Sequence, residues 1–165
     1  MEQTPLQAPA PAPRVEAGTA VADFTADATG GPVTLSAYRG KTVVLYFYPK
    51  DSTPGCTTET REFGDAAPDF AAANAVIFGV SRDSIRSHQR FKDALEIPFE
   101  LISDPDEALC QAFGVMKMKN MYGKQVRGIE RSTFVIGPDG VVARAWRAVK
   151  VPEHVAEVLA AVQSL

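Results

Sequence analysis

Residues 42–59, TVVLYFYPKDSTPGCTTE, contain the signals that decide the fold. They begin with the apolar run Val43–Tyr48, which is rich in β-branched and aromatic residues and short enough to be a strand buried on both faces. Pro49 then ends the strand, because proline has no N–H to donate to a neighbouring strand. After a short polar turn, Thr53 and Pro54 suit the N-cap and the first position of a helix. The stretch therefore predicts a buried strand, a tight loop and a helix in direct succession.

Cys56 is the third residue of that predicted helix, among backbone N–H groups that have no partner within the helix. A helix N-terminus favours a nearby anion by about 0.3–1 kcal/mol, and by up to about 2 kcal/mol when partly buried. That is too little to ionise a thiol fully at neutral pH, so a second positive group is expected, most simply an arginine. The alternative is that Cys56 is a small buried apolar residue. The neighbouring Pro, Gly and three threonines instead favour a loop that forms an open entrance to a reactive thiol.

The composition of the 165-residue chain excludes several classes of protein. Its length suits one domain that buries roughly two thirds of the surface of the unfolded chain. A net charge of −3 disfavours nucleic acid and anionic membranes as partners, and two cysteines are too few for a disulfide framework. No stretch reaches the roughly 18 apolar residues of a membrane span.

The first fourteen residues, MEQTPLQAPAPAPR, differ in composition from the rest of the chain. They are rich in Pro, Ala and Gln and lack hydrophobic periodicity, which predicts a disordered or polyproline-like tail at 1–14 and a single domain at 15–165. The basic start and continuous apolar segment of a secretory signal are absent. We therefore expect a cytoplasmic location.

Beyond the central stretch, predicted strands and helices alternate, and the chain then closes with a hairpin and a helix. Further strands are predicted at 33–35, 75–80, 99–102, 133–136 and 141–146, the last two joined by a turn at 137–140. Helices are predicted after Thr53 with a kink or break at Pro68, after an N-cap at Asp83, from Asp104 to Phe113 and from Pro152; residues 114–131 are predicted as a loop. This order predicts an α/β fold, a thioredoxin-like sandwich with a central mixed β-sheet flanked by helices. The thiol then lies at the carboxyl end of a parallel strand, where open α/β sheets bind ligands.

Several segments of this sequence resemble those of a known family. The segments are FYPKD at 47–51, TPGCTTE at 53–59, SDPD at 103–106, KNMYGK at 119–124 and GIERSTF at 128–134. Together they resemble peroxiredoxins, and most closely the bacterioferritin-comigratory-protein subgroup, also called PrxQ. The likeness extends from about residue 15 to the end of the chain. It departs from the family at Ala22, where the family usually has proline, a position that concerns strand entry rather than chemistry.

The resemblance implies a thiol peroxidase, an enzyme that reduces hydrogen peroxide and organic hydroperoxides in antioxidant defence without a cofactor or metal. Cys56 would be the peroxidatic cysteine, whose thiolate attacks the O–O bond and becomes a sulfenic acid. Thr53 would orient peroxide and thiolate, Pro49 would shield the sulfur, and Arg131 would supply the second positive charge. Purely structural roles are also open: a helix cap for Thr53, a strand end for Pro49 and a solvated side chain for Arg131. Glu59 matches the family's glutamate after the cysteine, but pairing with Arg131 and exposure to solvent are both open for it, so it is left out of the catalytic set.

The route by which the sulfenic acid is resolved depends on the second cysteine. Many PrxQ proteins carry a resolving cysteine five residues after the peroxidatic one, where this chain has Arg61, and others carry it near residues 91–92, where this chain again has none. The remaining thiol is Cys110, on a helix that a thioredoxin-like sandwich places on the opposite face of the sheet. Because a disulfide needs Cα atoms within about 7 Å, we favour a one-cysteine mechanism with Cys110 in the core. A Cys56–Cys110 disulfide, within or between chains, is the alternative.

The resemblance also implies partners, and other functions compete with it. Thioredoxin or a glutaredoxin-type protein would be the reductant and the protein a monomer, with neither nucleic acid nor membrane as partner. One competing function is a disulfide oxidoreductase, since TPGC at 53–56 is a C-x-x-C site that lacks its first cysteine. The other is a non-catalytic thioredoxin-fold binding module or holdase. A disulfide oxidoreductase requires the attacking thiol that is missing here. A binding module or holdase predicts a slow reaction of Cys56 with peroxide.

Overall fold

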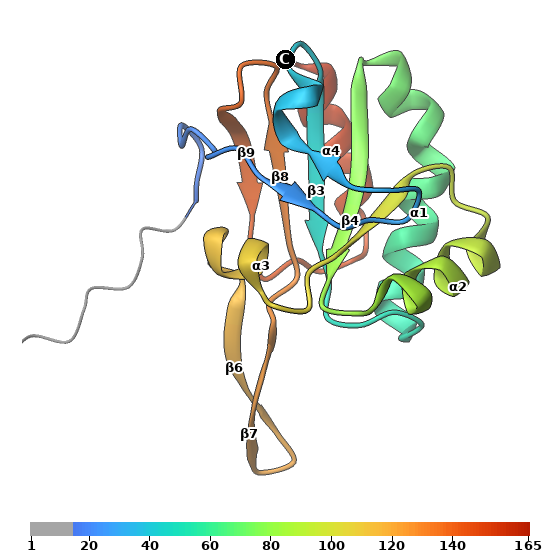
Figure 1. Cartoon of the computed structure of the whole chain (residues 1–165), viewed down its shortest axis with the longest axis vertical. Coiled ribbons are helices and arrows are strands. Elements are labelled where there is room, and N and C mark those ends of the chain that lie inside the picture. The colour runs from blue at the N-terminus through green and yellow to red at the C-terminus, as the bar shows by residue number, and fades with distance from the viewer. Residues whose placement is uncertain (1–14) are drawn as a thin grey trace, which may run out of the picture.

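A five-stranded mixed sheet forms the centre of the molecule (Figure 1). The computed structural model describes residues 15–165, apart from the side chain of Met121, so the tail predicted at 1–14 lies outside the described residues. The strand order is β5-β4-β3-β8-β9, with β3 (Thr42–Phe47) in the middle. β4 (Ala75–Ser81) and β5 (Glu100–Ser103) run parallel to β3, whereas β8 (Ser132–Ile136) and β9 (Val142–Trp146) form the antiparallel half.

Side chains of β3 enter both cores of the molecule, as the apolar run predicted. Val43, Leu45 and Phe47 belong to one cluster of buried side chains, and Val44 and Tyr46 belong to the other. Alternation of side chains along a strand places these two sets on opposite faces of the sheet. The predicted α/β sandwich with a central mixed sheet is therefore confirmed.

Different helices cover the two faces of the sheet. Buried side chains of α1 (Pro54–Ala72), α2 (Ile85–Leu95) and α4 (His154–Gln163) pack in the Tyr46 cluster. The Phe47 cluster is covered by α3 (Ala108–Ala112), by the 3₁₀ helix η1 (Leu35–Tyr38) and by the short strands β1 (Thr25–Ala26) and β2 (Val33–Thr34). Among the described residues, no helix combines the length and the apolar character needed to cross a bilayer.

The prediction of a loop at 114–131 is wrong. Residues there form a hairpin of β6 (Met116–Met121) and β7 (Lys124–Ile129), which extends away from the central sheet (Figure 1). Its turn residues Tyr122 and Gly123 both have positive φ, as a tight two-residue turn requires. The alternation of Met and Lys over 116–119 is the period-two signal of a strand.

Several helix boundaries also differ from the sequence-based predictions. α1 continues through Pro68, and the N-cap of α2 is Ser84, whose hydroxyl accepts a hydrogen bond from the Ser87 N–H, rather than Asp83. α3 is shorter than expected, although the Asp104 carboxylate accepts hydrogen bonds from the N–H groups of Leu109 and Cys110. α4 begins at His154, two residues after Pro152.

Candidate active site

The junction between β3 and α1 places Cys56 at the third position of α1. Thr53 is the N-cap residue, with extended backbone angles, but its side chain does not cap the helix. Its hydroxyl instead donates a hydrogen bond to the Lys50 carbonyl at 2.7 Å, which closes the loop between strand and helix. Pro49 is half-buried and follows Tyr48, the buried residue directly after β3. The structure therefore brings three of the predicted site residues together on one short segment.

Arg131 provides a positive charge beside the sulfur. Its Nη2 donates a hydrogen bond to Cys56 Sγ at 3.3 Å, across 75 positions of sequence. Strand pairing explains the approach, because Ser132 lies opposite Phe47 in the β3–β8 ladder and Arg131 directly precedes it. Cys56 is 1% exposed, so the expectation of an open entrance to the thiol is wrong and the sulfur is almost fully covered. A charge placed in such a shielded position acts more strongly than one in water.

Glu59 joins the same cluster, one turn of helix after the cysteine. Its Oε1 accepts a hydrogen bond from Arg131 Nη1 at 2.7 Å, and its side chain is fully buried. Glu59 Oε2 has no hydrogen-bond partner, which is costly for a buried carboxylate. Burial raises the pKa of Glu59 to about 7, against the opposing influence of Arg131. Below that pH the Glu59 carboxyl is neutral, so the positive charge of Arg131 is not compensated by Glu59 and acts on the Cys56 sulfur.

Replacing Glu59 by glutamine should remove a pH dependence of stability. The Glu59 pKa rises on folding from 4.5 to about 7, so the stability that this group contributes is complete below 4.5 and is lost as the pH rises through 7. Glutamine has the shape of the neutral carboxyl and cannot ionise. We expect the free energy of unfolding of wild type to fall by about 3 kcal/mol relative to Glu59→Gln over this range, measured by urea unfolding. The same pH dependence in both proteins would contradict this account.

Gly55 gives the guanidinium room to reach the sulfur. A Cβ at this position would lie 3.2 Å from Arg131 Nη2, the atom that contacts Sγ. Gly55→Ala should therefore displace the guanidinium and slow the oxidation of Cys56 about tenfold. Alanine is the better helix former, so the thermal stability should stay the same or rise. Stopped-flow oxidation and a thermal melt measure the two effects, and a wild-type oxidation rate in the variant would contradict the steric argument.

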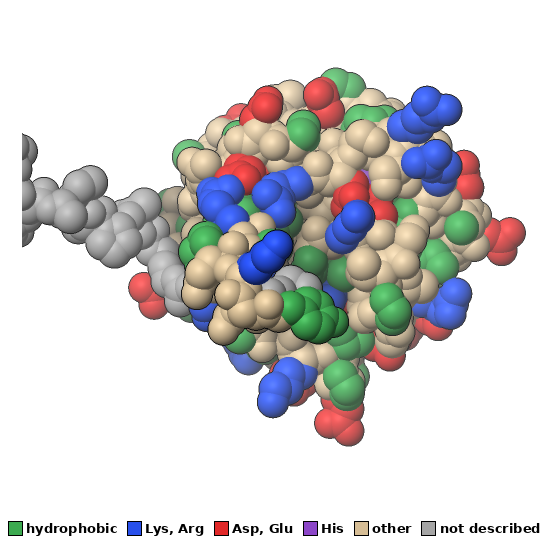
Figure 2. Space-filling view, turned by 90° about the horizontal axis from the view of Figure 1, so that it is seen from below, with side chains coloured by type: hydrophobic (Ala, Val, Ile, Leu, Met, Phe, Trp, Pro, Cys, Tyr) green, Lys and Arg blue, Asp and Glu red, His purple; other side chains and the backbone are tan. Residues whose placement is uncertain are grey.

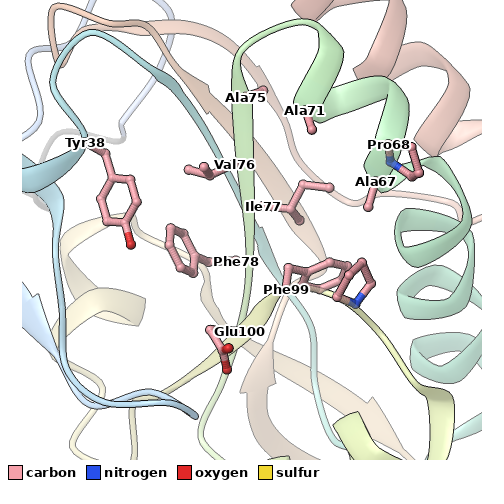
Figure 3. A pocket seen from close by; sticks show the side chains of 11 residues that line it. Tyr38, Ala67, Pro68, Ala71, Ala75, Val76, Ile77, Phe78, Phe99 and Glu100 are labelled. Atoms are coloured by element: carbon pink, nitrogen blue, oxygen red, sulfur yellow. The ribbon is translucent and has the colours of Figure 1, made fainter.

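A cavity of about 360 Å³ adjoins the candidate site. It is lined by Pro49, Arg131, Glu130, the β6 residues 117–119 and residues 148–149. Figure 2 shows the end of the molecule where the hairpin projects, with Lys and Arg side chains gathered around it. A second cavity, of about 420 Å³ and lined by Tyr38, Phe78 and Phe99 among others, contains none of the candidate site residues (Figure 3).

The second thiol lies in the other core. Cys110 is fully buried in the Phe47 cluster, whereas Cys56 belongs to the Tyr46 cluster across the sheet. Burial and the neighbouring Asp104 raise the pKa of the Cys110 thiol far above its ordinary value. Both cysteines are free. Joining them would require a large rearrangement of the sheet or its helices.

Comparison of the sequence with known proteins identifies a family and relatives of this chain. The family model described as the AhpC/TSA family matches residues 17–145. The Xanthomonas campestris protein named Peroxiredoxin Bcp is 54% identical over 151 residues, covering 91% of this chain and 94% of the relative. The Peroxiredoxin Bcp of Bacillus subtilis is 52% identical over 130 residues, covering 79% of this chain and 83% of the relative.

Solved structures agree with the sequence relatives. One, of the Xanthomonas campestris bacterioferritin comigratory protein and concerned with its alkyl peroxide reduction activity, has a TM-score of 0.84 and 53% identity, covering 91% of this chain and 96% of its own. Another, of a Xylella fastidiosa PrxQ mutant, has a TM-score of 0.88 and 44% identity, covering 92% and 98%.

Proposed function

Because this chain belongs to the AhpC/TSA family and, within it, to the Bcp/PrxQ peroxiredoxins, we propose that Cys56 carries its peroxidase chemistry with the help of Arg131, Thr53 and Pro49. The chain is a thiol peroxidase that reduces hydroperoxides. The observation that carries the residue assignment is the hydrogen bond from Arg131 Nη2 to Cys56 Sγ at 3.3 Å, at the third residue of a helix.

The first chemical step follows from this arrangement. The Cys56 thiolate attacks one oxygen of the hydroperoxide, a bond forms between sulfur and oxygen, and the O–O bond breaks. The sulfur is oxidised to sulfenic acid, while the other oxygen leaves as an alkoxide or hydroxide that takes up a proton to give alcohol or water. Arg131 stabilises both the thiolate and the negative charge that develops on the leaving oxygen. Thr53 donates its own proton to the Lys50 carbonyl, so its oxygen lone pairs can accept the O–H of the bound hydroperoxide.

The cavity beside Arg131 suits the organic part of an alkyl hydroperoxide. Pro49, Met118 and Val149 give it apolar walls, and its volume of about 360 Å³ lies in the range of small-molecule sites. The Xanthomonas campestris relative is described as reducing alkyl peroxides, which supports the same substrate class here.

Reduction of the sulfenic acid requires a thiol from outside the chain, because Cys110 lies in the opposite core. The external thiol attacks the Cys56 sulfur, water leaves and a mixed disulfide forms. A second thiol then displaces Cys56 as a thiol and becomes part of the product disulfide. We assign this role to thioredoxin or a glutaredoxin-type protein, acting on a monomer in the cytoplasm.

Turnover with defined reductants tests the proposed cycle. Peroxide consumption coupled to NADPH oxidation is measured with thioredoxin and its reductase, and separately with glutaredoxin, glutathione and glutathione reductase. Turnover that requires Cys56 is expected with either protein reductant. On its own, without thioredoxin or glutaredoxin, the chain should not reduce insulin disulfides. Insulin reduction without peroxide turnover would replace this function by that of a disulfide oxidoreductase.

A further inference from the structure

Asp51 connects the loop of the candidate site to α2. It lies between Pro49 and Thr53, and its side chain is 2% exposed. Its carboxylate accepts three hydrogen bonds: from Tyr48 Oη at 2.6 Å, from Ser87 Oγ at 2.8 Å and from His88 Nδ1 at 2.7 Å. Since Ser87 and His88 belong to α2, the loop and this helix share one buried network.

The hydrogen bonds of His88 indicate its protonation state. Its ring is fully buried, and its Nε2 lies 2.9 Å from the Ile102 carbonyl, an atom that can only accept a hydrogen bond. Nε2 must therefore carry a proton. Nδ1 lies 2.7 Å from the Asp51 carboxylate and 3.4 Å from the Tyr48 hydroxyl, so one proton is shared across the Nδ1–carboxylate contact. Because that carboxylate already accepts two hydroxyl protons, the hydrogen-bond geometry favours placing the shared proton on Nδ1, which makes the pair an imidazolium and a carboxylate.

The other titratable groups around the ring are consistent with this charge. Burial raises the pKa of the Tyr48 hydroxyl well above its usual value, so Tyr48 keeps the proton that it donates to Asp51. Asp83 lies beside the pair and accepts hydrogen bonds from the Asp51 N–H at 2.9 Å and the Ser81 hydroxyl at 2.6 Å. From β5 the ring meets the carbonyl of Ile102. Two carboxyl groups and the imidazole ring therefore form one cluster, in which Asp51 and His88 are buried and Asp83 is partly exposed.

We propose that the His88–Asp51 ion pair is a positioning pair for catalysis, which holds the Pro49–Thr53 loop in the conformation that presents peroxide to Cys56. The inference rests on the proposed roles of Pro49 and Thr53. Asp51 is tied through both its carboxylate and its backbone N–H to α2 and to the residues that precede it. Loss of the charge on His88 leaves the Asp51 carboxylate buried without a counter-ion, so the loop moves to bring it to water.

Paired substitutions separate the charge from the contact. His88→Gln and Asp51→Asn each leave one buried charge without its partner, whereas the double variant has two neutral amides that can hydrogen-bond to each other. We expect each single variant to be oxidised by hydrogen peroxide at Cys56 at least about tenfold more slowly than wild type. The double variant should recover to within about threefold. Amide hydrogen exchange at residues 50–53 should quicken in the single variants and return toward wild type in the double variant.

Ser84→Ala is the matched control on the same helix. It removes the hydrogen bond from the Ser87 N–H to the Ser84 hydroxyl, but it keeps the backbone carbonyl that accepts from the His88 N–H and the side-chain contacts of the pair. Its oxidation rate should therefore stay within about twofold of wild type. If Ser84→Ala slows oxidation as much as His88→Gln does, the effect belongs to helix stability and the inference is wrong. Single variants that unfold more easily yet retain the wild-type rate and loop exchange overturn it too.

A measurement on wild type keeps the inference testable if the single variants do not fold. Long-range ¹H–¹⁵N NMR correlations of His88 should show both ring nitrogens protonated at neutral pH, and a neutral ring would overturn the proposal. Rapid oxidation of wild-type Cys56 that His88→Gln leaves unchanged refutes the positioning pair alone. Absence of Cys56 oxidation in wild type refutes the proposed function itself.

Discussion

Replacing Cys56 by serine should abolish peroxidase turnover, whereas Cys110→Ser should retain most of it. A serine hydroxyl in the same place cannot be ionised by one neighbouring guanidinium and cannot form a sulfenic acid. Cys110, by contrast, is buried across the sheet from the reacting sulfur, and its thiol is held in the protonated form. Steady-state peroxide consumption with an external thiol donor measures both variants.

The Cys110 variant is the informative control in that comparison. Serine at this position buries a more strongly hydrated hydroxyl beside Asp104 in the Phe47 cluster, so a stability loss of about 1–3 kcal/mol is expected. The assay temperature must therefore stay well below the unfolding transition. Loss of turnover in folded Cys110→Ser protein, with the first oxidation step intact, would show that Cys110 resolves the sulfenic acid after all.

Arg131→Met should slow the oxidation of Cys56 by about 10²–10³-fold, the usual loss when one preorganised donor is removed from a reacting centre. Methionine has a similar length but no charge, so it loses the hydrogen bond to Cys56 Sγ. The same change leaves Glu59 buried without a partner, which destabilises the fold by itself. Stopped-flow oxidation by hydrogen peroxide gives the rate constant, and urea unfolding gives the stability.

Two further variants separate these effects of Arg131. Arg131→Met/Glu59→Gln removes the buried charge together with its partner, so it should recover stability but not rate. Arg131→Lys retains one positive charge but cannot donate to Sγ and to the Glu59 carboxylate from two nitrogens, so an intermediate rate is expected. A wild-type rate in the double variant would show that Arg131 acts only by compensating Glu59.

The parts of the site that are close in sequence could be predicted from it. An apolar run followed by Pro49 and then by Thr53 and Pro54 is a local signal, and it correctly predicted β3, the loop and α1. The need for a second positive group followed from the small effect of a helix terminus on an anion. That Arg131 is this group came from the family resemblance, and its contact with Sγ depends on the β3–β8 register, which local patterns do not specify.

Features that depend on contacts between distant segments were missed. The role of Glu59 is one of them, because the burial that raises its pKa comes from packing and makes it a partner of Arg131 that can change charge near neutral pH. The Asp51–His88 pair joins a loop to a helix 37 residues away, and neither residue has a distinctive local pattern. The near-complete covering of Cys56 comes from packing of its neighbours. The β6–β7 hairpin, in contrast, could have been predicted from the alternation of Met and Lys.

Reaction of the reduced wild-type protein with one equivalent of hydrogen peroxide tests the account most directly. The rate is followed by stopped flow, and the products are mapped by tryptic mass spectrometry after trapping with a sulfenic-acid reagent. The account predicts a reaction faster by orders of magnitude than that of an ordinary free thiol, with the oxygen on Cys56 and without a Cys56–Cys110 crosslink. Oxidation as slow as that of an ordinary thiol, or a stoichiometric crosslink between the two cysteines, would contradict it.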